Sequence, residues 1–146
     1  MSDFTAPPFD YADFPVLKTD RLTLREIRLE DTPAIFEMRK NGRIRQFIAR
    51  PQMTEYNAAQ DLVQRTRDAY EAGQGLGWSA NLREGTVCIG TCGFNRIEWP
   101  NKRAEIGGEM ATEYWGKGIA QEAVREILRF GFAHMDLHSI EARIDP

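Results

Sequence analysis

Cysteines and long apolar runs are scarce in this chain of 146 residues, and each scarcity excludes a class of protein. Only two cysteines are present, so the chain is not a small scaffold held together by disulfides. No apolar run approaches the roughly 20 residues of a membrane-spanning helix, and the first residues lack the basic and apolar blocks of a signal peptide. We therefore expect a cytoplasmic protein that does not enter a membrane.

A surplus of positive charge is also missing. Lysine and arginine total 19 against 22 aspartates and glutamates, which gives a net charge of -3. Three aspartates precede Lys18 with no basic residue among them, and they account for the whole deficit. A protein that binds a nucleic-acid backbone needs a basic surface, so nucleic acid is a poor candidate partner.

The residues that are present fit one globular domain preceded by an arm. Residues 1–15 hold three prolines and four aromatic side chains without helical or strand periodicity, which predicts an irregular arm. The remaining residues, 16–146, are 131 in number and are enough for one domain with a full hydrophobic core. We expect no second domain.

Hydrophobic periodicity predicts an α+β (or α/β) architecture for this domain. The expected helices run from about Glu30 to Arg39, from Thr54 to Ala72 and from Gly118 to Met135. The first expected strand begins at Leu22, and the other expected strands cover residues 77–82, 86–94, 104–110 and 139–144. Short turns separate the three middle strands, so they should form an antiparallel meander, whereas the last strand follows a helix and can lie parallel to its neighbour. A mixed, mostly antiparallel sheet with helices on both faces is the predicted fold.

A glycine-rich turn between the strand at 104–110 and the following helix carries the strongest chemical signal. Gly116 and Gly118 let backbone N–H groups approach a ligand closely, and the first turn of a helix adds unpaired donors and the positive end of its dipole. The layout predicts a site for a diphosphate, although its spacing is neither that of a Walker loop nor that of the GxGxxG fingerprint. On the glycines alone, a turn that merely starts a helix is the more frequent explanation.

Five stretches of the chain together resemble the GNAT N-acetyltransferase superfamily, and within it the RimJ/RimL-like branch of ribosomal-protein and related N-acetyltransferases. They are LKTDRLTLREIRLED at 17–31, GTCGF at 90–94, RAEIGGEM at 103–110, EYWGKGIAQEAV at 113–124 and the closing IEARIDP. The resemblance implies a GNAT fold with acetyl-CoA as cosubstrate. The family binds pyrophosphate, mostly through backbone N–H groups, on an Arg/Gln-x-x-Gly-x-Gly/Ala turn that falls here on Trp115, Gly116, Lys117, Gly118, Ile119 and Ala120.

Two details of this turn depart from the family pattern or stay open. Trp115 replaces the usual Arg or Gln, which weakens a side-chain contact but not the site. Lys117 is explained equally well as a phosphate contact and as a solvated side chain. The resemblance also implies that pantetheine lies between two splayed strand edges, which here are Glu109, Met110 and Ala111 on one side and Arg143 and Ile144 on the other.

A base is needed in such a reaction, because an amine must lose a proton before it attacks a thioester. Glu105 and Glu109 lie four residues apart on one predicted strand and therefore face the same side. The AEI setting of Glu105 resembles the position of the catalytic glutamate in some family members, so Glu105 is the first candidate and Glu109 the second. A carboxylate paired with a basic side chain is the alternative for either. The family implies direct attack without a covalent enzyme intermediate.

Other reactive side chains are assigned to packing. Cys88 and Cys92 are expected to share one face of a strand as small core residues. His134 and His138 have a metal-binding spacing, but the helix is expected to end between them and no third ligand follows, so no metal is expected. Three aromatic side chains, of which the last two are expected to be exposed, are candidates for shaping an acceptor pocket: Trp99, Phe47 and Trp78. Packing in the core or on the surface is the more frequent role for any one of them.

The sequence thus predicts an acetyl-CoA-dependent N-acetyltransferase that acts on a protein N-terminal amine or on a small-molecule amine. A non-catalytic acyl-CoA sensor and an interaction domain on the same fold are the alternatives, and a homodimer is allowed. Loops around 44–51 and 97–102 are expected to select the acceptor. Family members usually continue past the residues that match Asp145 and Pro146 with another helix and a strand pair. We therefore expect a truncated chain or one completed by a partner chain.

Overall fold

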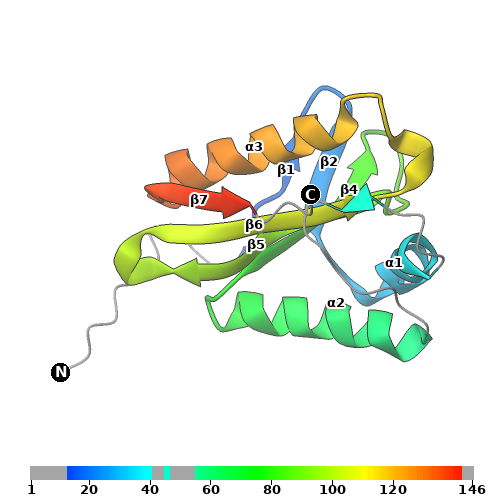
Figure 1. Ribbon diagram of the computed structural model, residues 1–146, viewed down its shortest axis with the longest axis horizontal. Coiled ribbons are helices and arrows are strands. Elements are labelled where there is room, and N and C mark those ends of the chain that lie inside the picture. The colour runs from blue at the N-terminus through cyan, green and yellow to red at the C-terminus, as the bar shows by residue number, and fades with distance from the viewer. Residues whose placement is uncertain (1–12, 41–44, 47–54, 143–146) are drawn as a thin grey trace.

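The computed structural model describes residues 13–40, 45–46 and 55–142. Seven strands form one sheet: β1 (Leu17–Lys18), β2 (Leu22–Glu26), β3 (Arg45–Gln46), β4 (Leu76–Leu82), β5 (Gly90–Glu98), β6 (Arg103–Met110) and β7 (Ser139–Ala142). The helices are α1 (Thr32–Arg39), α2 (Tyr56–Glu71) and α3 (Ile119–His134), with short 3-10 turns η1 (Leu29–Asp31), η2 (Trp99–Asn101) and η3 (Thr112–Tyr114). Helix α3 covers one face of the sheet, and α1 and α2 lie on the other (Figure 1).

The sheet has the predicted mixed topology. Its strand order is β1-β2-β4-β5-β6-β3, and every pair along this path is antiparallel. Strand β7 pairs with β6 in parallel, as its position after a helix predicts. The antiparallel meander, the parallel last strand and the helices on both faces are therefore confirmed.

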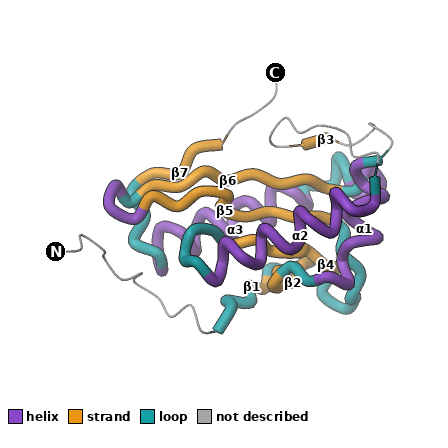
Figure 2. The backbone as a smooth tube through the Cα atoms, turned by 90° about the horizontal axis from the view of Figure 1, so that it is seen from below, coloured by secondary structure: helices purple, strands orange, loops and turns teal. Residues whose placement is uncertain are grey.

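One edge of β6 is shared by two short strands (Figure 2). Strand β7 pairs with residues Arg103–Ile106, and β3 pairs with Glu109 and Met110. Gly107 and Gly108 lie between these two stretches, and no described strand pairs with them on this edge. The gap lies near the end of β6, and η3 and the glycine-rich turn follow in sequence.

Each face of the sheet has its own hydrophobic core, and burial of this apolar surface drives the folding. The larger cluster lies under α3 and includes Trp78, Phe94 and Ile127. The smaller cluster lies under α1 and α2 and consists of Ile27, Ile35, Met38, Ala59, Val63 and Cys88. The buried apolar side chains of the strands belong to the larger cluster, whereas the smaller cluster is made by α1 and α2 with Ile27 just after β2 and Cys88 just before β5.

The prediction that Trp78 is exposed is wrong, because its ring is fully buried under α3. It packs edge-to-face against Phe94 and Phe130, with ring centroids 6.0 and 5.8 Å away. Its indole N–H donates to the carbonyl of Pro15 at 2.9 Å, so the end of the arm is anchored to the core. Phe14 also packs on the rings of Tyr70 and Trp78, at 4.9 and 5.6 Å.

Strand β5 begins at Gly90 and not at Thr86, and it continues to Glu98 past a bulge at Asn95. Cys88 consequently lies before the strand, in the cluster under α1 and α2, whereas Cys92 lies in the cluster under α3. The prediction that the two cysteines share a face is therefore wrong, while their burial is confirmed.

The helices match the predicted ranges within a few residues. Thr54, where the second helix is predicted to begin, lies outside the described residues. On α3, Phe130 and Gly131 face the sheet, while the side chain of Phe132 is half exposed. None of the helices that the structure describes is long and apolar enough to cross a membrane.

Candidate functional site

The glycine-rich turn connects the end of β6 to the start of α3. Gly116 and Gly118 have φ angles of +76° and +74°, a region that glycine adopts at little cost and other residues rarely occupy. Gly118 is the N-cap of α3. A side chain at Gly116 would meet no atom within 4 Å, so the space in front of the turn is open.

The backbone N–H groups of this turn are available to a ligand. Within the described part of the chain, no oxygen accepts a hydrogen bond from the N–H groups of residues 116–120. The first intrahelical bond here runs from the N–H of Glu122 to the carbonyl of Gly118, at 3.1 Å. Because these donors also lie at the positive end of the α3 dipole, the turn suits an anion such as a diphosphate.

The tryptophan that replaces the usual Arg or Gln has a structural contact. The Trp115 indole N–H donates to the carbonyl of Met110 at 3.0 Å, and its ring packs against the core under α3. The N–H of Ala111 donates to the carbonyl of Ile89 at 2.9 Å, which holds the chain just before the turn. Trp115 therefore closes the loop between β6 and the turn, and its side chain is not free to contact a phosphate.

The other predicted cofactor residues divide into exposed and packed positions. Gly116, Lys117 and Gly118 are exposed, while Ile119 is buried and Ala120 half-buried against the core. The Lys117 ammonium lies 5.9 Å from the centre of the Tyr114 ring, within range of a cation–π contact. The exposed trio can meet a ligand, and the packed residues fix the start of the helix that presents it.

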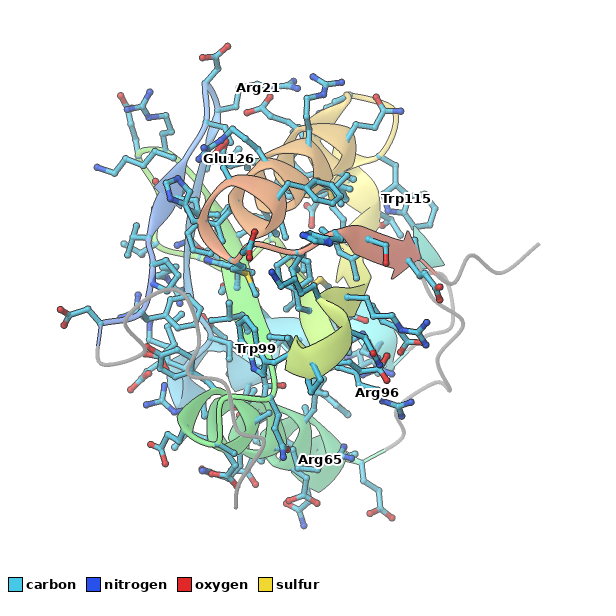
Figure 3. All side chains as sticks on the ribbon, turned by 90° about the vertical axis from the view of Figure 1, so that its left-hand side faces the viewer. Arg21, Arg65, Arg96, Trp99, Trp115 and Glu126 are labelled. Carbon is cyan, nitrogen blue, oxygen red and sulfur yellow. The ribbon has the colours of Figure 1, made fainter. Side chains whose placement is uncertain are left out.

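The turn is held from outside by Arg21, which lies between β1 and β2 beside α3 (Figure 3). Its guanidinium donates through Nη1 to the carbonyl of Lys117 at 2.8 Å and through Nε to Glu122 Oε1 at 2.7 Å. The backbone N–H of Arg21 and the hydroxyl of Thr19 both donate to Glu122 Oε2. The segment TDR of the first stretch and the turn WGKG, about a hundred residues apart in sequence, thus form one unit.

Of the two candidate bases, Glu109 is sealed inside the protein. Its carboxylate lies 3.5 Å from Nε of Arg39 in α1, and their side chains are 0% and 4% exposed. The carboxylate is on the α1 and α2 side of the sheet, beside the end of β6. Glu109 is therefore an internal ion-pair partner rather than a group that a substrate reaches.

Glu105 occupies the same face of β6 but is only half-buried. Its neighbours Ala104 and Ile106 belong to the core under α3, so strand alternation directs Glu105 to the opposite side. Its register partners are Arg96 on β5 and Glu141 on β7. Of the two glutamates, Glu105 is the one whose side chain is partly exposed.

Sequence reasoning missed the two arginines that contact this region. Arg39 follows Ile35 and Met38 on the buried face of α1, and an arginine on such a face signals a buried acidic partner. Arg21 lies in the stretch at 17–31, which resembles the family as a whole without singling out this residue. No local sequence pattern connects Arg21 with Glu122. The acceptor-side candidate Phe47 and the predicted edge residues Arg143 and Ile144 lie outside the described residues.

The remaining predicted candidates have structural contacts. Trp99 is half-buried, and its indole N–H donates to the carbonyl of Gly73 at 2.7 Å. The His138 imidazole lies 4.0 Å from Asp136 on an exposed turn. Among the residues that the structure describes, no group of three His, Cys, Asp or Glu side chains is placed to hold a metal ion.

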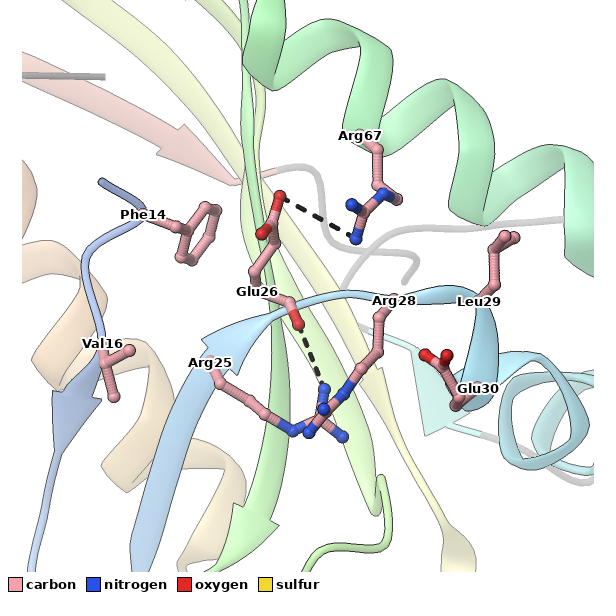
Figure 4. A pocket seen from close by; sticks show the side chains of 8 residues that line it. All are labelled: Phe14, Val16, Arg25, Glu26, Arg28, Leu29, Glu30 and Arg67. Carbon is pink, nitrogen blue, oxygen red and sulfur yellow. Dashed lines mark hydrogen bonds and ion pairs between the residues drawn. The ribbon is translucent and has the colours of Figure 1, made fainter. Parts of the chain in front are cut away.

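A separate groove of about 560 Å³ lies between the end of the arm, β2 and α2 (Figure 4). Two of its arginines are already engaged, Arg25 with both oxygens of Asp31 at 2.7 and 2.9 Å and Arg67 with the carbonyl of Ile27 at 2.9 Å. The hydrogen bond to Asp31 raises the pKa of Arg25 above its ordinary value despite partial burial. These contacts join η1 to β2, and no residue of the glycine-rich turn lines the groove.

Comparison with known proteins identifies the family. Residues 21–146 match the model of the acetyltransferase (GNAT) domain. The chain belongs to the GNAT acetyltransferase family. The match begins at Arg21 and extends over the whole sheet from β2 onward, the helices and the glycine-rich turn, so the family predicted from the sequence is confirmed.

Two bacterial proteins, both named as uncharacterized N-acetyltransferases, are similar over most of the chain. The N-acetyltransferase p20 of Bacillus licheniformis is 37% identical over 130 residues, which cover 89% of this chain and 73% of the relative. The N-acetyltransferase YoaA of Bacillus subtilis is 33% identical over 129 residues, which cover 88% and 73%. Both names describe the same class of enzyme.

Solved structures of the RimL type share the fold. The RimL ribosomal L7/L12 α-N-protein acetyltransferase in complex with coenzyme A has a TM-score of 0.74 at 21% identity, over 90% of this chain and 76% of that one. The acetyl transferase from Salmonella typhimurium that modifies the N-terminal serine of L7/L12 has a TM-score of 0.72 at 20% identity, over 87% and 74%. The GNAT fold is therefore confirmed.

Proposed function

We propose that this GNAT chain transfers an acetyl group from acetyl-CoA to a primary amine. One observation supports this function above the others: a row of backbone N–H donors without acceptors in the described chain, at a positive-φ glycine turn that starts α3. The names of the two relatives, and the coenzyme A bound to the RimL neighbour, support acetyl-CoA as the ligand.

In this proposal the turn and the edge of β6 hold different parts of acetyl-CoA. The diphosphate is placed at the N–H groups of Gly116, Lys117 and Gly118, where the space is open. The pantetheine arm is placed at Gly107 and Gly108, the part of the edge between β7 and β3. Because Glu109 and Met110 pair with β3, an arm that reaches them would have to displace that strand.

Glu105 is the proposed base. It takes one proton from the ammonium form of the acceptor, and the neutral nitrogen then attacks the carbonyl carbon of the thioester. The new C–N bond forms as the C–S bond breaks, and the second proton of the nitrogen passes to the departing thiolate. In this proposal Glu109 does not contact the substrate. It pairs with Arg39 inside the protein and helps to hold the end of β6 in place.

The acceptor in this proposal is first a protein N-terminal amine. Two RimL-type neighbours of the same fold modify the N-terminus of L7/L12 by their names, which is the support for this choice. A small-molecule amine is the second candidate, since the residues expected to select the acceptor include 44–51, most of which the structure does not describe.

Calorimetry with acetyl-CoA and a thiol-release assay with N-terminal peptides and small amines test the proposal. We expect binding that Gly118→Glu abolishes, and turnover that Glu105→Gln lowers about 10²- to 10⁴-fold, the range of a lost general base. The matched control is Glu84→Gln at the exposed turn after β4, which should leave binding and turnover unchanged. Absence of acetyl-CoA binding would contradict the proposal, and binding without turnover of any amine would favour a sensor.

A further inference from the structure

The glycine-rich turn has an acidic side chain close to the place where the diphosphate is proposed to bind. Glu122 lies in the first turn of α3 and is partly buried, with 18% of its side chain exposed. Burial opposes its ionisation, but hydrogen bonds from Thr19 and from Arg21 hold the pKa of Glu122 below its ordinary value. The carboxylate is therefore charged at neutral pH, and alone it would repel a diphosphate.

Arg21 compensates the negative charge of Glu122 and makes three hydrogen bonds, two to Glu122 and one to Lys117. Its Nε and its backbone N–H each bind one oxygen of Glu122, and its Nη1 binds the carbonyl of Lys117. The fork of a guanidinium satisfies such divergent acceptors at once, which a lysine ammonium does less well. The negative charge beside the turn is thereby neutralised where the ligand is proposed to approach.

The contact with Lys117 also fixes the direction of a peptide group. In a trans peptide the carbonyl and the following N–H point in opposite directions. Because the Lys117 carbonyl points to Arg21, the N–H of Gly118 points away from Arg21. A side chain at Gly118 would come within 3.5 Å of Nη2 of Arg21, so the guanidinium lies directly against the turn.

We propose that Arg21 is a positioning residue for phosphate binding, which neutralises Glu122 and orients the Lys117–Gly118 peptide toward the diphosphate. The proposal rests on the function proposed above and adds a residue from the opposite end of the chain to the phosphate site. It predicts that Arg21 affects how tightly the phosphates of acetyl-CoA are held and not the chemistry of acetyl transfer.

The test compares acetyl-CoA with S-acetylpantetheine, which carries the thioester but no phosphate. For Arg21→Gln we expect the Kd and KM for acetyl-CoA to rise about 10- to 100-fold, the usual effect of losing hydrogen bonds to charged groups. The kcat at saturation should stay within about twofold, and kcat/KM for S-acetylpantetheine should not change. Arg65→Gln, an exposed arginine on α2, is the matched control and should bind acetyl-CoA like the wild type.

Two further variants separate positioning from general damage. Arg21→Lys keeps the charge and should lose less affinity than Arg21→Gln, and adding Glu122→Gln to Arg21→Gln should recover at least threefold in Kd because the uncompensated charge is removed. Acetyl-CoA binding by Arg21→Gln within twofold of wild type would overturn the proposal, and so would equal losses for both thioesters or no recovery in the double variant. Absence of acetyl-CoA binding by the wild-type chain would instead contradict the proposed function itself.

Discussion

Two arginine–glutamate pairs flank the path from the end of β6 to the start of α3, and they differ in how much water reaches them. Arg39 and Glu109 are 4% and 0% exposed and lie on the α1 and α2 side of the sheet. Arg21 and Glu122 are 47% and 18% exposed and lie beside the glycine-rich turn. The same two types of side chain are thus a sealed pair in one place and an open pair in the other.

This difference in exposure to water decides how much each pair contributes to the stability of the fold. Removing one partner of a sealed pair leaves a charge in the interior, at a cost of several kcal/mol, so neither partner can be removed alone without a large loss of stability. An exposed pair contributes from zero to about 1 kcal/mol to stability, because water and salt compete with it. The open pair therefore has little effect on folding, and its arrangement is free to serve a ligand at the turn.

The largest expected effect comes from breaking the sealed pair. Arg39→Leu should lower the free energy of unfolding by about 3 to 5 kcal/mol, since the buried Glu109 carboxylate loses its ion pair with Arg39. Urea unfolding at neutral pH measures the change. Arg65→Leu on the exposed side of α2 is the control and should shift stability by no more than about 0.5 kcal/mol. A loss below about 1 kcal/mol in Arg39→Leu would show that water reaches Glu109.

A second variant sharpens the same point. Replacing both partners, as Arg39→Leu with Glu109→Leu, removes the buried charge together with its counter-ion, and apolar replacements of such pairs are often close to neutral. We expect the double variant to recover at least half of the stability that Arg39→Leu loses. Equal stabilities of the single and double variants would contradict this explanation.

The next effect concerns Cys88, which lies in the same hydrophobic cluster as Ile35 and Met38 of α1. Burial raises the pKa of the Cys88 thiol to about 11. At pH about 8 its thiolate fraction is therefore on the order of 100-fold below that of an ordinary cysteine, and alkylation should be slowed at least as much. The rate measured with iodoacetamide in a Cys92→Ala background should rise strongly in Arg39→Leu. Fast alkylation of the folded parent would contradict a sealed interior.

The sequence predicted the architecture because its elements have strong local signals. The alternation from Leu22, the two long amphipathic helices and the turn residues between strands are readable without tertiary information, and the structure confirms them. Strands β1 and β3, of two residues each, were not predicted, because so short a strand has no periodicity and forms only through its partner. The early start expected for β5 failed for a related reason: Thr86 accepts a bond from Arg25 instead of joining the ladder.

The candidate site was predicted where the chemistry is local and missed where it is not. Gly116 and Gly118 by themselves predict a turn followed by the start of a helix, and their positive φ angles agree with that prediction. The burial of Glu109 could not be predicted, because alternation places Glu105 and Glu109 on one face without saying that Arg39 covers only one of them. Arg21 was missed for the same reason, since its partners are about a hundred residues away.

The glycines of the open region should show a smaller effect. Gly116→Ala and Gly118→Ala should each lower the free energy of unfolding by about 1 to 2 kcal/mol, because alanine is strained at φ angles of +76° and +74°. Neither new methyl group meets a hard clash, so the cost is one of backbone conformation. Urea unfolding measures it, and Ala133→Gly on α3 is a control for simple glycine–alanine exchange in a helix. A gain in stability at Gly116 would contradict the positive φ.

The smallest effect is the contribution of the open pair to stability and its dependence on pH. The folded-state pKa of Glu122 lies below its ordinary value of 4.5, so the unfolded chain binds the proton more readily. The stabilisation is therefore present above about pH 4.5 and is lost as the pH falls through the lower, folded-state pKa. We expect wild type to exceed Glu122→Gln by no more than about 1 kcal/mol at pH about 6, and the difference to shrink as the pH falls below about 4.5. Urea unfolding across this range measures it. A difference that stays constant with pH would show that the variant changes packing rather than charge, and a difference of several kcal/mol would place this pair with the sealed one.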